Sequence, residues 1–525
     1  MRPAEPDGHP RRPIRRALLA GLVALVLVAA AAGTWLVLNS GSKKAGLDPQ
    51  AAIDPDRGYH LVVWDYRLPY SSPSGAPFSE SSAEAIRRFE RRYPNVTVDL
   101  HLLDPSAGPT DLAAALTAGY PPDVYCSPFG PPATGSDLQI PIGLYLDYET
   151  WSEYHPVAWQ TVKTGGTVWS WPRYLLLWPW LGNVDLLSLA GVDPAAISTG
   201  GWTREQFALA ASGLAAAGGA GRSAFLATNS PAVVVRDLLF SAGLAGDAVD
   251  AEDSAGADPD AAGFWRGPKP GEVLRWLSRL DQAKTLQPAS PNATVIDSFV
   301  RGRSAVLAGP SPWATLFLLE PVERPEAWQF TLPDRDDRPA MVLLPPPHGS
   351  REPSVVWVSA ATVTVFRQAR YRGDDNTRLA VELARELTVG TRPWLRDQYL
   401  CVPAAYGELA SWRVRCERSG PVGLFAVRAF DQLARLPGGR LSSVLTTLDY
   451  GPYVPELGPS QGTEAGAAPR KPSPAGLLQP GYLGPFLRDV VAPSAARLWS
   501  GEISPEDMAA ELGAFWAPAP PEGGD

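Results

Sequence analysis

The hydrophobic pattern of residues 59–125 predicts five elements in the order strand, helix, strand, helix, strand. Apolar runs at 59–65, 95–100 and 123–125 are typical of strands, and the patterns at 81–92 and 112–118 are typical of helices. This alternation predicts a parallel sheet, in which ligands bind beyond the carboxyl ends of the strands. Those ends present Trp64 and Asp65 after the first strand, and Cys126 and Ser127 after the third.

A tryptophan-rich segment, residues 166–187, comes next. It holds four tryptophans and two prolines, namely Trp169, Trp171, Trp178, Trp180, Pro172 and Pro179. Large rigid rings with one polar N–H suit a concave surface that stacks on a ligand, although core packing accounts for some of them, including at least one of Trp178 and Trp180. We interpret the segment as a crossing between two lobes, with the ligand held beside it.

The α/β pattern continues to the end of the chain. We expect strands at 341–347 and 353–365, the second of which crosses between lobes, and helices at 203–216, 232–242, 272–283, 376–388, 393–399, 488–499 and 504–515. Thr203 has the chemistry of a helix N-cap. A loop of Pro and Ser presents Trp313, and residues 451–484, rich in Pro and Gly, are expected to form a loop or a partly disordered segment.

The N-terminus contains an apolar run without charges, residues 17–38, between a basic tail (1–16) and a polar linker (41–57). Its length suits a membrane-spanning helix, and the arginines before it place the tail in the cytoplasm and the rest of the chain outside the cell. The alternative is a signal peptide cleaved after Ala30-Ala31-Ala32, which would give a secreted protein. The run continues past that point, which favours a retained anchor.

Composition narrows the classes of function. A chain of 525 residues exceeds a single core, and a net charge of -9 argues against a nucleic-acid partner. Three cysteines without a CxxC pair and five histidines predict no structural metal site and no cofactor. Cys401 and Cys416 form a disulfide or remain free; their spacing leaves both open.

Several ordered landmarks together resemble the extracellular solute-binding proteins of carbohydrate ABC importers, the maltose-binding-protein-like group. They include Phe89-Glu-Arg-Arg-Tyr-Pro-Asn-Val-Thr-Val, Gly119-Tyr-Pro-Pro-Asp-Val-Tyr, Trp171-Pro172 followed by Asn183-Val-Asp-Leu-Leu, Trp202-Thr-Arg-Glu-Gln-Phe and Phe299-Val-Arg-Gly-Arg-Ser-Ala-Val. The resemblance implies a two-lobe periplasmic-binding-protein-like (type II) α/β fold with hinge crossings. Lobe 1 would comprise residues 59–172 and 358–410, and lobe 2 residues 173–355 and 415–518.

The resemblance also implies the residues that line the cleft between the lobes. They are Trp64, Asp65, Cys126, Ser127, Trp171 and Arg173, with Trp313 and Tyr482 on the facing lobe; Trp357, in the second crossing strand, faces either the cleft or the hinge. Sugar rings stack on indoles, and their hydroxyls need acceptors such as the Asp65 carboxylate. Asp65 has an alternative interpretation as a turn cap.

The expected function is capture of a neutral, sugar-like ligand by a monomeric, membrane-anchored receptor that serves ABC permease subunits. One alternative is a sensing or assembly ectodomain that partners a signalling protein, and another is a secreted glycan-acting enzyme. The sequence contains no Gly-x-Ser-x-Gly elbow, phosphate-binding loop or His-Glu-x-x-His motif, so we expect a binding protein and not an enzyme.

Overall fold

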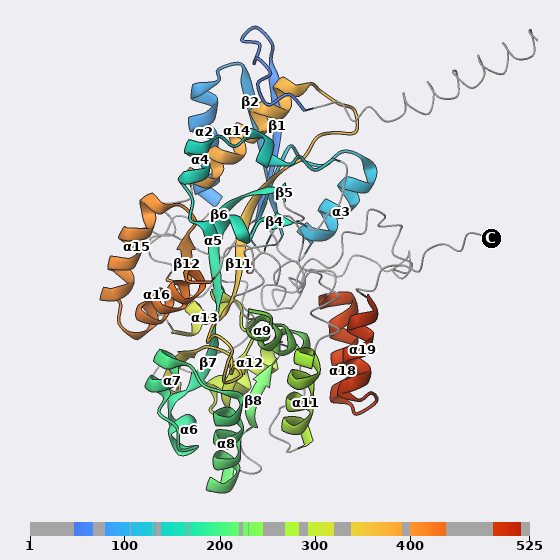
Figure 1. Ribbon diagram of the computed structural model, residues 1–525. Helices are drawn as coiled ribbons and strands as arrows, with labels where there is room; N and C mark the ends of the chain where they lie inside the picture. Colours follow the sequence, from blue (N-terminus) through green and yellow to red (C-terminus); the bar gives the residue numbers. More distant parts are fainter. Residues whose placement is uncertain are drawn as a thin grey trace, which may run out of the picture. The chain divides into compact units, whose positions relative to one another are not determined.

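The computed structural model shows two α/β lobes, each built on its own sheet (Figure 1). It describes residues 47–66, 79–104, 107–128, 138–164, 167–219, 224–244 except 229, 268–282, 292–319, 338–390, 399–436 and 487–515, with the single residues 130, 132 and 441. Residues 52–525 form one compact unit, which contains both sheets.

The first lobe contains a six-stranded sheet in the order β12-β6-β11-β3-β1-β2. Its strands are β1 (Tyr59–Tyr66), β2 (Val96–Leu103), β3 (Val124–Ser127), β6 (Ser170–Trp178), β11 (Trp357–Val365) and β12 (Cys401–Pro403). The pairs β1–β2 and β1–β3 are parallel, which confirms the expected parallel unit, whereas β11 runs antiparallel to β3 and β6.

Two helices from distant parts of the chain pack together beside this sheet. They are α2 (Ser79–Arg92) and α14 (Asp374–Gly390), which contact one another and the strands (Figure 1). In α2 the buried residues Ala85, Ile86 and Phe89 recur at helical spacing, so one apolar stripe faces the core. Across it, Arg88 and Arg92 bond Glu386 of α14 at 2.9 and 3.2 Å.

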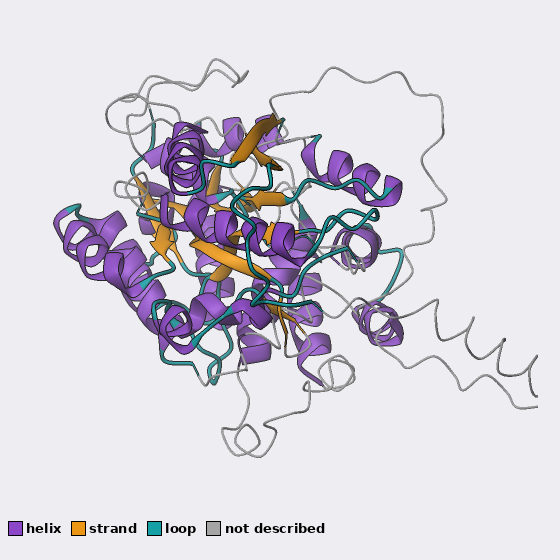
Figure 2. Ribbon diagram, turned by 90° about the horizontal axis from the view of Figure 1, so that it is seen from above, coloured by secondary structure: helices purple, strands orange, loops and turns teal. Residues whose placement is uncertain are grey.

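The second lobe contains a four-stranded sheet in the order β10-β7-β9-β8. Its strands are β7 (Trp180–Asn183), β8 (Ala224–Thr228), β9 (Ser304–Ala308) and β10 (Met341–Leu344). Helices α8 (Arg204–Leu214), α9 (Pro231–Leu244), α11 (Pro268–Gln282), α12 (Asn292–Val300), α18 (Ala492–Trp499) and α19 (Pro505–Phe515) accompany it. Figure 2, a view from above, shows helices around the strands of the molecule.

The tryptophan-rich segment passes from one sheet to the other, which confirms it as a crossing. Only Pro179 separates β6 of the first sheet from β7 of the second. Proline has no N–H to donate to a ladder, so the strand pairing ends there and resumes with new partners. Strand β11 pairs with β6 along its whole length, from Trp357 opposite Trp178 to Thr364 opposite Ser170.

The remaining described elements complete the two lobes. They are η1 (Ile142–Tyr145), α3 (Gly108–Ala118), α4 (Tyr148–Ser152), α5 (Pro156–Gln160), the hairpin β4 (Lys163–Thr164) and β5 (Thr167–Val168), α6 (Val184–Leu189), α7 (Pro194–Gly200), α13 (Pro312–Leu319), α15 (Tyr406–Arg418) and α16 (Pro421–Ala434), with π-helical turns at Ala215–Gly219 and Leu487–Val491.

Most expected elements occur with small shifts of boundary. Thr203 caps α8 in a reciprocal capping box with Gln206, which confirms that prediction. Strand β11 starts at Trp357, four residues later than expected, because Pro353 begins a segment without ladder hydrogen bonds. The expected helix at 393–399 falls almost wholly outside the described residues, as do the apolar run 17–38 and the segment 451–484. Within the described part of the chain, no helix is long and apolar enough to span a bilayer.

The three cysteines are free thiols, and all are buried. Cys401 lies in β12 and Cys416 in α15, so the disulfide that the sequence left open is not formed. Burial raises the pKa of Cys126 and of Cys401 well above the usual value, and that of Cys416 to about 12. A thiol must ionise to react, so each is expected to be inert in the folded protein.

Thiol titration checks this assignment. We expect Ellman's reagent to react slowly with the native protein and to count three thiols in denaturant without reductant. A count of one would contradict the free thiols. A fast reaction of native protein would contradict their burial.

Candidate functional site

A buried ion pair joins the carboxyl end of β1 to β6. The guanidinium of Arg173 approaches the Asp65 carboxylate at 3.2–3.3 Å, and both side chains are almost completely enclosed. Ser82 of α2 donates to Asp65 at 2.5 Å and accepts from Arg173 at 2.9 Å. Burial alone lowers the pKa of Arg173, but the Asp65 carboxylate opposes this and leaves the pKa raised. All three polar groups are therefore satisfied within the protein.

A β-bulge explains how Arg173 reaches Asp65. Opposite β6, Ala361 pairs with Tyr174 and the next residue, Thr362, pairs with Pro172, so Arg173 is the extra residue. Pro172 cannot donate a ladder bond, and bulges re-aim the side chain of the residue that they insert. The Trp171-Pro172-Arg173 sequence thus determines where the guanidinium points.

Cys126 and Ser127 lie on β3 beside this ion pair. Cys126 is fully buried and pairs with Val363 of β11, whereas Ser127 is 8% exposed and pairs with Thr362. Burial is the main cause of the raised pKa of Cys126, and the negative charge of Asp65 adds to it. The structure therefore brings together Asp65, Cys126 and Arg173, three of the predicted site residues.

Trp171 belongs to a row of aromatic rings that extends to the surface. Its ring centroid lies 6.0 Å from Tyr154 and 6.1 Å from Trp159, and Trp159 stacks on Trp151 at 4.7 Å with an angle of 6°. Trp151 is 41% exposed and Trp171 only 2%. The indole N–H of Trp171 is buried, and no described protein atom accepts its proton. Sequence analysis missed Trp151 and Trp159, although both precede the crossing closely.

A second buried cluster lies where the sheets meet. The Arg236 guanidinium of α9 lies 4.7 Å from the ring centre of Trp357 and 5.2 Å from that of Trp178. It also donates to Asp237 at 2.7 and 2.8 Å, and Asp237 accepts from the indole of Trp180 at 2.8 Å. We call these five residues the crossing cluster: Trp178, Trp180, Arg236, Asp237 and Trp357.

The crossing cluster ties both crossing strands to one helix of the second lobe. Burial raises the pKa of Asp237, and the adjacent Arg236 opposes that shift. Trp357 also packs edge-on against Phe240 of α9, with ring centroids 4.9 Å apart. Sequence analysis missed Arg236 and Asp237, but a signal exists: they are two charged residues in α9, which is otherwise apolar and almost entirely buried.

Comparison with known families identifies the architecture. Residues 71–366, more than half of the chain, match the family described as bacterial extracellular solute-binding proteins. The chain belongs to this family. Membership places it among binding proteins and not among enzymes. No curated protein matches the sequence.

Solved structures share the fold of this solute-binding protein. A candidate oligosaccharide periplasmic-binding protein from Synechococcus sp. MITs9220, in complex with zinc, is 18% identical over 87% of this chain and 98% of its own, with a TM-score of 0.56. The cyclic alpha-maltosyl-1,6-maltose binding protein from Arthrobacter globiformis is 14% identical over 87% and 98%, with a TM-score of 0.55. The ABC substrate-binding protein Lmo0181 from Listeria monocytogenes, in complex with cycloalternan, is 13% identical over the same shares, with a TM-score of 0.54. These likenesses show the two-lobe periplasmic-binding-protein-like fold.

The remaining predicted residues of the solute-binding protein lie apart. Trp64 lines a hollow that contains none of the other predicted site residues. Trp313 does not lie in a loop as expected, because α13 begins at Pro312 and includes its backbone. The Trp313 side chain is outside the description, and Tyr482 lies outside the described residues. Among the described residues no group of His, Cys, Asp and Glu is arranged to hold a metal ion.

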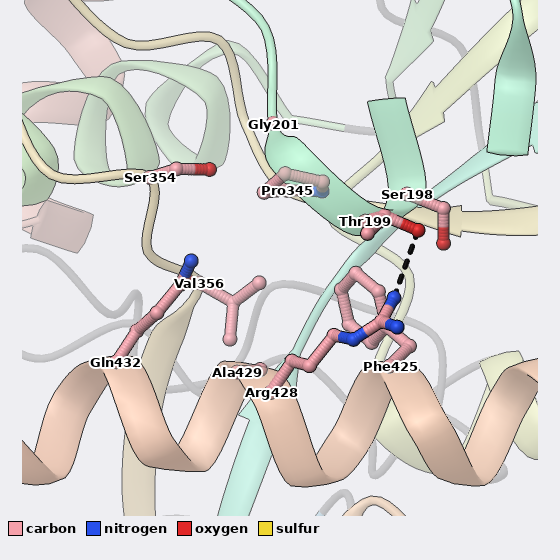
Figure 3. A pocket seen from close by; sticks show the side chains of 10 residues that line it. All are labelled: Ser198, Thr199, Gly201, Pro345, Ser354, Val356, Phe425, Arg428, Ala429 and Gln432. Carbon is pink, nitrogen blue, oxygen red and sulfur yellow. Dashed lines mark hydrogen bonds between the residues drawn. The ribbon is translucent and has the colours of Figure 1, made fainter. Parts of the chain in front are cut away.

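A narrow hollow lies where α7 meets α16. Figure 3 shows its lining, which includes Gly201 opposite Ser354 and a hydrogen bond of 2.8 Å from Arg428 of α16 to Thr199 of α7. Gly201 has a φ of +78°, and a Cβ there would lie 2.0 Å from the Ser354 hydroxyl. Only glycine fits this position without a shift of the chain.

Substitution of Gly201 tests this packing. We expect Gly201→Ala to lower the free energy of unfolding by about 1–3 kcal/mol, because it combines backbone strain with a clash. The matched control is Gly200→Ala, since a Cβ at Gly200 meets no atom within 4 Å. Urea denaturation of both variants measures the difference, and equal stabilities would contradict the close approach.

Proposed function

We propose that the protein captures a neutral oligosaccharide between its two lobes and delivers it to an ABC importer. The family supports capture of a solute, and the named ligands of two structural neighbours are saccharides. Closure of two lobes about crossing strands is a common way to enclose such a ligand. In this proposal β6, β11 and the crossing cluster form the hinge.

The unpaired indole N–H of Trp171 carries the proposal. A buried donor without an acceptor costs free energy, so a ligand that brings an acceptor to this N–H would be stabilised. A sugar hydroxyl is a suitable acceptor, and Trp151, the exposed ring of the row that leads to Trp171, offers an aromatic ring to the C–H groups of a sugar.

The other predicted residues have two roles in this proposal. Four of them are enclosed and make their hydrogen bonds or packing contacts within the protein, namely Asp65, Cys126, Arg173 and Trp357. Their role in this proposal is to hold the site in position and not to contact the ligand. The proposed ligand contacts are Ser127, Trp313 and Tyr482, whereas Trp64 lines a separate hollow.

Calorimetric titration of the full-length protein in detergent tests the proposed ligand class. We expect saturable binding of at least one member of a set of neutral glucose oligosaccharides, and a loss of about tenfold in affinity for Trp171→Phe, the size of one lost hydrogen bond. Trp412→Phe is the matched control, because Trp412 is also a buried tryptophan with an unpaired indole N–H but lies in α15. If no saccharide binds, or if both variants lose affinity equally, the proposal is wrong.

We also propose that residues 17–38 anchor the protein in the membrane with the binding lobes outside. Twenty-two uncharged, mainly apolar residues match the thickness of a bilayer. The full-length protein should stay in the membrane fraction after a carbonate wash, and a variant that lacks 17–38 should not. N-terminal sequencing that begins after residue 32 would show cleavage and a secreted form instead.

A further inference from the structure

The hollow that includes Trp64 lies in the first lobe at the end of the sheet far from the crossing. Its volume is about 700 Å³, and its lining comes from Arg57 before β1, from Val62 and Trp64 within β1, from the segment before β3 and from the segment after β11. Strand β11 runs from Trp357 in the crossing cluster to Val365 beside this hollow, and eight residue steps of strand span about 26 Å. Its lining contains no residue of the crossing cluster and none of the aromatic row from Trp151 to Trp171, so the hollow is distinct from the site proposed between the lobes.

Hydrogen bonds fix the walls of the hollow in place. The Asp123 carboxylate is 1% exposed, accepts from the Val62 N–H at 2.8 Å and pairs with Arg372, which donates to the His60 carbonyl at 2.9 Å. The two wall segments are joined by the Ala369 N–H, which donates to the Gly119 carbonyl at 2.9 Å, and by a bond from the Gln368 amide to the Pro121 carbonyl. A wall held in this way needs little ordering when a ligand binds.

Arg57 fixes the third side of the hollow. Its guanidinium bonds Asp375 at 2.6 Å and the Arg372 carbonyl at 2.9 Å, and it covers the ring of Tyr59 at 4.9 Å. Two of the three arginines of the lining, Arg57 and Arg372, are thus already neutralised by carboxylates.

The third arginine is unpaired. Arg370 is exposed and has no hydrogen-bond or ion-pair partner among the described residues. Around the same hollow are the rings of Tyr120, which is 68% exposed, Tyr371, which is 38% exposed, and the half-buried Trp64. The Tyr120 hydroxyl and the Trp64 indole N–H also lack a partner in the described part of the chain.

We propose that this hollow is a second binding site, and that it takes an acidic saccharide: a sugar with a ring carboxylate. Aromatic faces stack on sugar rings, the free phenol and indole N–H bond hydroxyls, and the guanidinium fork of Arg370 matches a carboxylate. The volume is in the range of pockets for small molecules and fits two or three sugar units. The protein as a whole is acidic, with a net charge of -9, so attraction of an anion depends on this local cation.

Calorimetric titration of the full-length protein with trigalacturonate tests the site. We expect saturable binding that weakens about tenfold in Arg370→Gln and also weakens at high salt, because the ion pair is solvent-exposed. Tyr120→Ala should weaken binding as well. The matched control is Arg351→Gln, which replaces an exposed arginine in a loop of the second lobe. This variant should bind trigalacturonate like the unmodified protein.

Hydrogen–deuterium exchange locates the bound trigalacturonate. We expect protection of peptides that cover 119–123 and 368–372, and none at 170–183. Absence of binding would overturn the proposal, and so would equal affinity of Arg370→Gln and Arg351→Gln, or protection confined to the crossing. Equal binding of neutral galactotriose would overturn the role of the carboxylate. The result is independent of the proposed neutral ligand, whose titration with Arg370→Gln should be unchanged.

Discussion

Arg173→Ala is expected to lower the free energy of unfolding by about 3–5 kcal/mol, because it leaves a buried carboxylate without its partner. Asp65 is 1% exposed, and once Arg173 is removed, the donors left to it among the described residues are Ser82 and the Tyr66 N–H. Guanidine denaturation monitored by circular dichroism measures the loss.

Two controls distinguish loss of the partner from loss of the pair. The double variant Asp65→Asn with Arg173→Met removes both charges, so it should recover much of the stability lost in the single variant. Arg275→Ala breaks an exposed pair with Glu506, at 3.1 Å, and should have little effect. If Arg173→Ala lowers the free energy of unfolding no more than Arg275→Ala does, the ion pair of Asp65 and Arg173 is not buried in solution.

Trp357→Ala is expected to lower the free energy of unfolding by about 3–5 kcal/mol, the cost of a cavity the size of an indole. Trp357 of β11 is 2% exposed, and the Arg236 guanidinium of α9 lies 4.7 Å from its ring centre. Loss of the ring removes the cation–π contact together with the packing against Phe240. Thermal and chemical unfolding of the full-length protein measure the change.

The milder variant Trp357→Phe tests which interaction dominates. It keeps an aromatic face toward Arg236 and Phe240. The decrease in its free energy of unfolding should therefore be less than half that of the alanine variant. Trp151→Ala, at a ring that is 41% exposed, should have a smaller effect on unfolding. Equal losses for Trp151 and Trp357 would contradict the buried crossing cluster.

The elements whose sequence signals involve only neighbouring residues were predicted well. The strand at 59–65 and the capped helix after Thr203 follow from apolar period and capping chemistry. Each signal depends only on neighbours along the chain, which a single sequence contains.

The roles of individual side chains could not be predicted in the same way. Asp65 looked like a free acceptor because its partner, Arg173, is 108 residues away and turned toward it by a bulge. The sequence assigned at least one of Trp178 and Trp180 to the core, whereas in the structure both are enclosed, and their N–H groups bond Ser359 and Asp237. A buried indole with a polar partner has the same local sequence pattern as an exposed one, so only the fold distinguishes them.

The strand order of the first sheet has a consequence for synthesis of the chain. Strand β11 lies between β3 and β6 but is made more than 170 residues after both, so the β3 edge that it covers stays open while the ribosome makes the four strands of the second sheet. The nascent first lobe therefore exposes backbone that can pair with another chain. Protection by a chaperone during this interval should increase the yield of folded protein, and a stop codon before residue 357 should give an aggregating product.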